Sequence, residues 1–322
     1  MSSWHRPLVA FAASMALLAA LTAVGLVVDD RTVAGSPVWF KPFKFSVSFV
    51  AYALSLAWML SLLPRFRRIG WWAGTTVMVA SAAEMVLITG QALRGRRSHF
   101  NHETPLDSAL YDAMAVSVVV LWSGALAIAV LLFRARIADR ASAWAIRCGS
   151  VVALAGAATG FLMVRPTDEQ RAAGGAGDAG IVGAHAVGVP DGGPSMPVTG
   201  WATTGGDLRI GHFVGMHALQ VLPLVLLVLA ALAPRFARLA DERVRLRLVL
   251  IASAAYAGAF VLVTWQALRG QALFRPDGIT LTAAAVLALA TAAAVAAALR
   301  TAPPGPPGPP AAEDADRAEV AV

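Results

Sequence analysis

The chain has few charged residues, and this shortage limits the class of protein it can form. Charged residues make up 14% of its 322 positions, whereas a soluble domain has about 25%. Hydrophobic residues make up 58%, and the mean hydropathy is +0.67. A water-exposed globule cannot hide so much apolar surface. The composition therefore predicts a protein whose main partner is the lipid bilayer.

Cysteine and the common catalytic motifs are also scarce. Cys148 is the only cysteine, which excludes an intramolecular disulfide and any cysteine-based metal cluster within one chain. The sequence contains no Walker motif, HExxH, GxSxG or cysteine–histidine zinc pattern, so it gives no support for ATP-driven work or common hydrolase chemistry. The net charge of +7 is explained by arginines at the ends of membrane helices. We therefore expect no nucleic-acid partner.

Eight hydrophobic runs reach the length of about 17–25 residues that a helix needs to cross a bilayer. The first run is longer than the roughly 7–15 residues of a signal peptide's hydrophobic region, so we expect it to be retained. The predicted fold is all-α, a polytopic membrane protein with eight transmembrane helices. The runs lie at 8–28, 43–63, 71–93, 110–133, 144–164, 210–233, 245–268 and 279–300.

Two short sequences occur twice in the chain, in the same order. Pro-Arg-Phe stands at 64–66 and again 170 residues later, and Gln-Ala-Leu-Arg-Gly stands at 91–95 and again 175 residues later. Two echoes at nearly the same offset indicate a tandem duplication of a four-helix unit. Each unit has an even number of spans, so the two units would be parallel, with a pseudo-twofold axis along the membrane normal.

The duplication and the composition together define the predicted domains. The tail is rich in proline, glycine and acids, which is typical of a disordered segment. The long loop at 165–209 has many glycines, which disfavour a helical or sheet domain, but its last part leads directly into a helix and favours an ordered cap. The assigned regions are 1–140 and 141–302 for the two membrane units and 303–322 for the tail.

Arginine-rich short loops set the predicted orientation. The loops at 64–70, 134–143 and 234–244 hold many of the basic residues, and basic short loops stay on the cytoplasmic side of a membrane. Both termini are then cytoplasmic, and the loop at 165–209 is external. Abundant alanine and arginine with little lysine is typical of a high-GC bacterial genome. We therefore expect a multi-pass protein of the bacterial plasma membrane.

The placement of histidine is the strongest functional signal. Five of the six histidines fall in predicted outer loops or near the outer end of the sixth span, and imidazole binds metal or haem iron and titrates near neutrality. His212 and Met216 stand four apart on one helix face, whereas His217 points about 140° away from His212. The candidate cofactor-binding residues are His99, His102, His212, Met216 and His217. The fifth outer histidine is His185.

These residues leave two interpretations open. As cofactor ligands they would hold haem or a transition metal, with a His–Met pair suited to haem iron or copper. We favour haem slightly, because neighbouring arginines would suit its propionates and would repel a bare metal ion. The alternative is a set of interfacial or cap histidines that are hydrogen-bonded to loop backbone.

Glu84 is the one acid deep inside a predicted span. An ionised carboxylate facing lipid is costly, so we expect Glu84 to face the helix bundle. Ser81, Ile88 and Gln91 share its helix face at the expected spacing. The matching position in the second unit is Ala259, so only one half carries the carboxylate. Its role is either proton transfer or pairing with an arginine, or else a structural hydrogen bond to a neighbouring helix.

The repeated segment places Gln91 and Arg94 in one unit, and Gln266 and Arg269 in the other, where helices reach the outer surface. Its glycine is expected to end the helix. Each guanidinium would clamp an acid such as Asp107 or an anionic substrate, or extend to lipid headgroups. We also expect both arginines to ring the same pocket as the histidines.

Two further patterns lie near the outer surface. Lys41 and Lys44 flank aromatic residues and are candidates for an anion site, or for an interfacial anchor alone. Gly211-x-x-x-Gly215 is a small-residue pattern that predicts close packing of the sixth span.

Two four-helix units in tandem, with histidines toward the outer face, resemble the layout of the haem A synthases. The resemblance is architectural and no local motif matches. At the offset of 170, His212 aligns with Pro42 and His217 with Val47, so no residue role carries over. Three functions stay open: a haem- or metal-binding redox-type protein, a proton-coupled or anion-handling transporter whose path passes Glu84, and a non-catalytic membrane scaffold. The sequence does not decide whether the chain is an enzyme.

Overall fold

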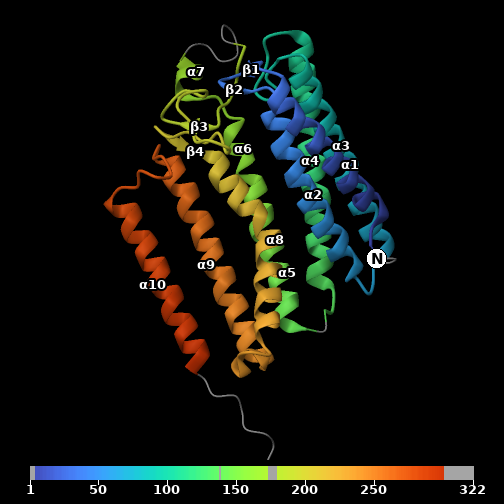
Figure 1. Ribbon diagram of the computed structural model, residues 1–322, viewed down its shortest axis with the longest axis vertical. Helices are drawn as coiled ribbons and strands as arrows, with labels where there is room; N and C mark the ends of the chain where they lie inside the picture. The colour runs from blue at the N-terminus through green and yellow to red at the C-terminus, as the bar shows by residue number, and fades with distance from the viewer. Residues whose placement is uncertain (1–3, 138, 173–179, 301–322) are drawn as a thin grey trace, which may run out of the picture.

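The computed structural model describes residues 4–137, 139–172 and 180–300. Within these ranges it has eight helices that are long and apolar enough to cross a membrane. The expected all-helical fold is therefore confirmed, and the helices run side by side as one bundle (Figure 1). The predicted tail at 303–322 lies outside the described residues.

Each half of the chain contributes four long helices. Those of the first half are α1 (Arg6–Val28), α2 (Phe40–Ser61), α3 (Arg67–Leu93) and α4 (Pro105–Arg134). Those of the second half are α5 (Arg140–Ala158), α8 (Leu208–Leu232), α9 (Glu242–Leu268) and α10 (Gly278–Arg300). The predicted span at 144–164 is interrupted at Thr159, after which the short α6 (Gly160–Met163) begins.

The four helices of each half pack in the same order. In the first half α1 lies against α2, α2 against α3, α3 against α4, and α1 also against α3. In the second half the corresponding pairs are α5 with α8, α8 with α9, α9 with α10, and α5 with α9. The halves meet where α4 contacts α5 and α2 contacts α8. In Figure 1 the first half lies on the right and the second on the left.

Glycine brings α8 close to two neighbours. A Cβ atom added to Gly215 would lie 2.4 Å from the Cα of Gly156 in α5, and one added to Gly211 would lie 2.2 Å from Oγ1 of Thr264 in α9. Both distances are shorter than any real contact, so only glycine fits. The predicted close packing through Gly211 and Gly215 is confirmed.

A cap of short segments covers one end of the bundle, called the cap end below (Figure 1). It contains the hairpin of β1 (Thr32–Val33) and β2 (Ser36–Pro37), and the antiparallel pair of β3 (Ala186–Val187) and β4 (Gly206–Asp207). The single turn α7 (Asp168–Ala172) lies nearby, and the 3-10 turn η1 (Ala237–Ala240) lies at the opposite end. An ordered cap was expected for the end of the 165–209 loop, whereas the β1–β2 hairpin was not predicted.

The repeated Gln-Ala-Leu-Arg-Gly segment ends α3 and α9 in the same conformation. Gly95 has φ +66° and Gly270 has φ +73°, a region that residues with a Cβ atom rarely adopt. In both copies the glycine amide bonds to the carbonyl three residues back, and the next amide bonds to the carbonyl five residues back. The expected helix end at glycine is confirmed.

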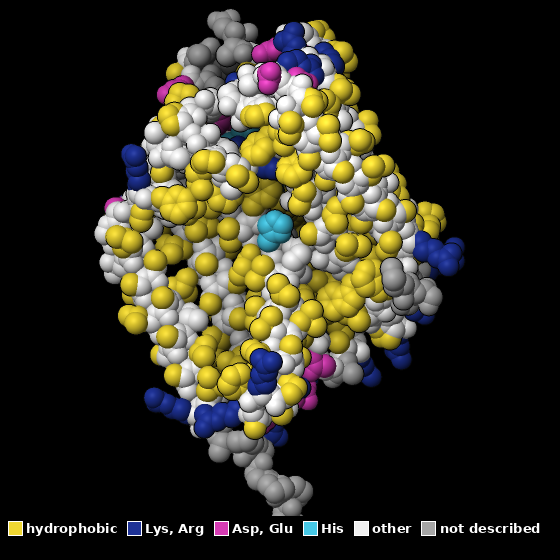
Figure 2. Space-filling model, in the orientation of Figure 1, with side chains coloured by type: hydrophobic (Ala, Val, Ile, Leu, Met, Phe, Trp, Pro, Cys, Tyr) yellow, Lys and Arg dark blue, Asp and Glu magenta, His cyan; other side chains and the backbone are white. Residues whose placement is uncertain are grey.

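The surface of the bundle is largely apolar. Figure 2 shows hydrophobic side chains across its middle, with Lys and Arg toward the two ends. Leu281, Val286 and Leu289 of α10 are all exposed. The main cluster of buried hydrophobic side chains lies mostly in the first half, where it includes Met59 and Met85, and it extends to Ile146, Ala153 and Leu219 of the second half. This distribution suits a bundle surrounded by lipid.

Candidate functional site

A cavity of about 640 Å³ lies under the cap, between the two halves. It is called the cap cavity below. Its walls come from the β1–β2 hairpin, the start of α2, the segment at 96–102, α4, α6, the segment at 182–195 and the start of α8. Its volume is within the range of about 300–1,000 Å³ that small-molecule sites occupy.

Five basic side chains line the cap cavity: Lys41 and Lys44 of α2, Arg96 and Arg97 after α3, and Arg209 of α8. Arg96 is paired with Glu103 at 2.7 Å. Arg209 is paired with the buried Asp207, at 2.6 Å. Lys44 Nζ donates to the carbonyl of Thr199 at 2.7 Å, which leaves its charge uncompensated. Among the described residues, no ion pair joins Lys41, Lys44 or Arg97 to a carboxylate. Three positive charges without a protein counterion therefore converge on one space.

The nearby acids act on the two lysines only without direct contact: Glu84 and Asp191 interact electrostatically with Lys41, and Asp207 with Lys44, but none forms an ion pair with them. Asp112 is exposed on α4. Asp191 accepts a hydrogen bond from His185 Nδ1 at 2.9 Å and others from the amides of His185 and Ala186. Burial alone would raise the pKa of Asp191, but these hydrogen bonds outweigh it and hold the pKa below its usual range. Asp191 is thus an anion that is committed to orienting His185.

The cap cavity also gathers four histidines, each with its Nδ1 atom already engaged. The partners are Ser98 Oγ for His99, Ser108 Oγ for His102, Asp191 for His185 and the Gly156 carbonyl for His212. A carbonyl can only accept, so His212 carries its proton on Nδ1, and its neutral Nε2 is an acceptor. No hydrogen bond to Nε2 of these four histidines occurs among the described residues.

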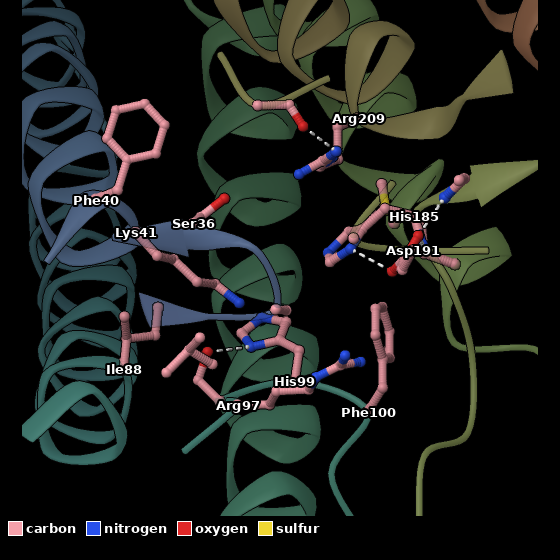
Figure 3. Close-up of a pocket in the computed structure, with 18 of the residues that line it drawn as sticks. Ser36, Phe40, Lys41, Ile88, Arg97, His99, Phe100, His185, Asp191 and Arg209 are labelled. Atoms are coloured by element: carbon pink, nitrogen blue, oxygen red, sulfur yellow. Dashed lines mark hydrogen bonds and ion pairs between the residues drawn. The ribbon is translucent and has the colours of Figure 1, made fainter. Parts of the chain in front are cut away.

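Burial keeps two of these histidines uncharged near neutral pH. Burial lowers the pKa of His99 well below its usual value, and the nearby charge of Lys41 lowers it further. Burial also lowers the pKa of His185, against the opposing effect of Asp191. Figure 3 shows Lys41 directed from α2 toward His99, with His185 and Arg209 on the facing wall. The cavity therefore presents basic side chains beside neutral imidazoles.

His5 shows how a histidine with a purely structural role differs. Its Nδ1 accepts the amide hydrogen of Leu8 and caps α1, and its Nε2 bonds to the Trp71 carbonyl at 2.9 Å. Both nitrogens are therefore used within the fold. The cap-cavity histidines keep one nitrogen available, which is what a ligand-binding role requires.

A second, smaller cavity of about 170 Å³ adjoins the first. It is called the slot below. Its walls are mainly apolar, but Glu84, His217 and Gln220 also line it, together with the predicted ligand Met216. His217 Nδ1 lies 3.3 Å from Gln220 Oε1. The sequence-predicted cofactor residues are thus divided: His99, His102 and His212 line the cap cavity, and His212, Met216 and His217 line the slot.

Glu84 is only 3% exposed, which confirms that it faces protein. Ser81, Ile88 and Gln91 of the same helix face are buried as well. Ser117 of α4 donates a hydrogen bond to Glu84 Oε1. The carboxyl group therefore joins α3 to α4.

Arg94 and Arg269 line neither cavity, so the prediction that they ring the histidine pocket is wrong. Arg94 Nη1 lies 2.8 Å from Asp107 Oδ1, which confirms the predicted Arg94–Asp107 clamp. Arg269 binds Asp277 in the same way, at 2.5 Å. The glycine turn reverses the chain just after each arginine, so the nearest acid is the one at the start of the next helix.

Gln91 and Gln266, from the two copies of the repeated segment, also form hydrogen bonds near the ends of their helices. Gln91 Nε2 donates to Asp107 Oδ1 at 3.0 Å, and Gln266 Nε2 donates to the Ala272 carbonyl at 2.9 Å. Each amide fixes the segment that follows its own helix.

Sequence reasoning missed Arg97, Arg209, His185 and Asp191 as site residues. Two signals were present: Arg97 ends a basic run next to a predicted ligand pair, and Arg209 directly precedes a predicted span. The pairing of His185 with Asp191 had no signal, because it depends on how a glycine-rich loop folds. Across the described residues, no group of three or more His, Cys, Asp or Glu side chains is arranged to hold a metal ion.

Comparison of the chain with protein-family models, with curated proteins and with solved structures gives no match.

Proposed function

We propose that this chain is an integral membrane protein whose cap cavity binds a small organic anion. The observation that carries the proposal is the convergence of Lys41, Lys44 and Arg97 without a carboxylate partner. Charges partly withdrawn from water are costly unless they are paired. A carboxylate or phosphate group would supply the missing partner through charge-assisted hydrogen bonds.

The neutral histidines give this cavity a second kind of selectivity. The free Nε2 of His212 accepts a hydrogen bond, so it would recognise a hydroxyl or amine group on the same ligand. The remaining wall, including Phe40, Phe45 and Ile88, is apolar and suits a hydrocarbon framework.

The anion proposal is tested on protein purified in mild detergent, by mass spectrometry of co-purified small molecules. Lys41→Ala and Arg97→Ala each remove one counterion, so we expect about tenfold less bound anion, corresponding to a lost charged hydrogen bond. Arg275→Ala is the matched control, because Arg275 is an exposed cap-end arginine that lines neither cavity. Equal anion content in all three variants would refute the proposal.

A specific observation favours haem as a second candidate for the occupant. His212 and His185 are each oriented through Nδ1, by a carbonyl and a carboxylate, as ligand histidines in metal sites are. Lys41 and Arg97 would then bind the propionates. If haem binds, the purified protein has a Soret band that shifts on reduction and weakens in His212→Ala. Colourless protein from haem-replete cells, without copper, iron or zinc, excludes this candidate.

We also propose that the two halves are a tandem duplication inserted in parallel in a bacterial plasma membrane, with both termini cytoplasmic. The repeated sequences, the recurring helix contacts and the matched helix ends support the duplication. Arginines at 64–70 and 134–143 support the orientation, which makes the cap end external. Reporter fusions after Arg68 and Arg140 should read as cytoplasmic, and one within 180–195 as external. An external reading at Arg140 would contradict the eight-span topology.

A further inference from the structure

The slot has the shape and lining expected of a site for a hydrocarbon chain. It follows α4 from Val118 to Ala129, a rise of about 16 Å at 1.5 Å per residue. Leu56 of α2, Ala153 of α5 and Leu219 of α8 form other parts of its wall, and all three are buried. Its length and apolar lining match an extended acyl or isoprenoid chain better than a compact polar solute.

The polar groups of the slot are largely satisfied within the protein. Glu84 is bonded to Ser117, and His217 to Gln220. The Trp122 indole donates to the Leu154 carbonyl at 3.1 Å. A chain lying in the slot would therefore contact mainly hydrocarbon and would not displace these hydrogen bonds.

The slot continues directly into the cationic cap cavity. Phe45, Val118, Ala157, His212 and Phe213 line both spaces. Because the two cavities share these walls, one molecule can extend from the basic end into the apolar end. The small side chain of Ala157 stands at this junction.

The cap cavity is also bordered by apolar side chains on the outside of the bundle. On α4, Val118 is 38% exposed and Val119 is 50% exposed. Phe161 of α6 is 41% exposed, and Val164 directly after α6 is 44% exposed. These residues belong to segments that would lie in the bilayer. The face seen in Figure 2 is likewise hollowed between the halves and lined by hydrophobic side chains. A ligand can thus enter sideways from lipid.

Resting on the proposed anion site, we propose that the occupant is an anionic amphiphile taken from the bilayer. Its charged headgroup binds Lys41, Lys44 and Arg97 in the cap cavity, and its hydrocarbon chain lies in the slot. The headgroup is recognised because the basic side chains lack carboxylate partners. The hydrocarbon chain is held by the dispersion contacts that it makes with the apolar wall of the slot. A water-soluble anion would occupy only the cap cavity and would leave the slot empty.

The test uses the full chain in lipid nanodiscs that contain a phosphatidylglycerol probe with a photoreactive diazirine midway along one acyl chain. We expect cross-links at slot-lining positions that are not exposed, such as Leu121, Ala125 and Ala129 of α4 and Ala153 of α5. Lys41→Ala should reduce slot cross-linking at least tenfold, and Arg275→Ala should leave it unchanged. A phosphatidylcholine probe with the same chain should label only lipid-facing positions such as Val286 and Leu289. Equal slot labelling by both probes would overturn the proposal.

A junction variant separates chain binding from anion binding. Ala157→Phe should block the slot, and thus lower slot cross-linking at least tenfold, while glycerol 3-phosphate still binds in the cap cavity. Ala155→Phe is the control, because Ala155 is exposed on the same helix and lines neither cavity.

The two proposals fail in different ways. Protein that retains a Lys41-dependent soluble anion but gives no slot cross-links would overturn the amphiphile inference alone. Protein in which neither glycerol 3-phosphate nor phosphatidylglycerol binds in a Lys41-dependent manner would overturn the anion site as well.

Discussion

The repeated segment is alike in the two halves of the molecule, whereas the cap cavity is lined by residues that differ between them. The Arg94–Asp107 and Arg269–Asp277 pairs occupy equivalent places and tie each third helix to the fourth. The cap cavity uses positions that differ between the halves: at the offset of 170, Lys41 corresponds to Gly211 and Lys44 to Val214. What the halves share therefore builds the bundle, and what they do not share builds the site.

The largest expected difference between the halves is in the stability lost when a helix glycine is replaced by alanine. In the second half α5 and α8 meet through backbone at Gly156 and Gly215, so even a methyl group at Gly215 has no space. Gly215→Ala should lower the free energy of unfolding by about 3 kcal/mol or prevent folding. Gly90→Ala in α3 is the control, because nothing lies within 4 Å of the added atom. Denaturant titration in detergent measures both. Equal stability of the two variants would contradict the close packing.

The two arginine clamps differ in burial, and this sharpens the comparison. The Asp107 side chain is fully buried, whereas that of Asp277 is 37% exposed. Asp107→Asn removes the charge that Arg94, Gln91 and Thr104 share, so stability should fall by about 2 kcal/mol. Asp277→Asn should cost clearly less, because water can replace the lost partner. Thermal unfolding of both variants gives the difference in stability. A larger loss of stability for Asp277→Asn would contradict the assignment of the stronger clamp to Arg94 and Asp107.

Acidification should destabilise the protein through the cap cavity. The folded-state pKa values of His99 and His185 lie below the usual value of 6.5, so below about pH 6.5 the unfolded chain binds more protons than the folded one. Stability should therefore fall as pH drops, by up to about 1.4 kcal/mol per histidine and pH unit. The repeated clamps carry no histidine. His99→Gln should flatten the profile between pH 6.5 and 5, and an unchanged slope would show that His99 is not buried as a neutral group.

The sequence predicts features that depend on local pattern. Hydropathy locates the eight long apolar helices, although α5 ends at Ala158 and not near 164 as predicted. Glycine at 95 and 270 predicts two helix ends, and the cost of a buried carboxylate predicts the orientation of Glu84. Arg94 was correctly paired with Asp107, because both partners lie next to one turn. The same local partner explains why Arg94 is unavailable to the pocket.

The composition of the cap cavity was not predictable, because it depends on contacts between distant segments. His185 lies against Phe100, with ring centroids 4.9 Å apart, although 85 residues separate them. Lys44 bonds to Thr199 across 155 residues. The glycine-rich loop that brings these groups together has no periodic pattern that fixes its path.

The most direct test of a specific anion site compares the dissociation constant of phosphatidylglycerol among three proteins in matched detergent: wild type, Lys41→Ala and Arg275→Ala. Lys41→Ala removes a site cation that has no counterpart in the other half, whereas Arg275→Ala removes the same charge at the same end of the bundle outside the cavity. Binding of phosphatidylglycerol should weaken at least tenfold in Lys41→Ala and stay within twofold of wild type in Arg275→Ala. Equal weakening in both variants would show that binding follows net charge, and it would contradict a specific site between the halves.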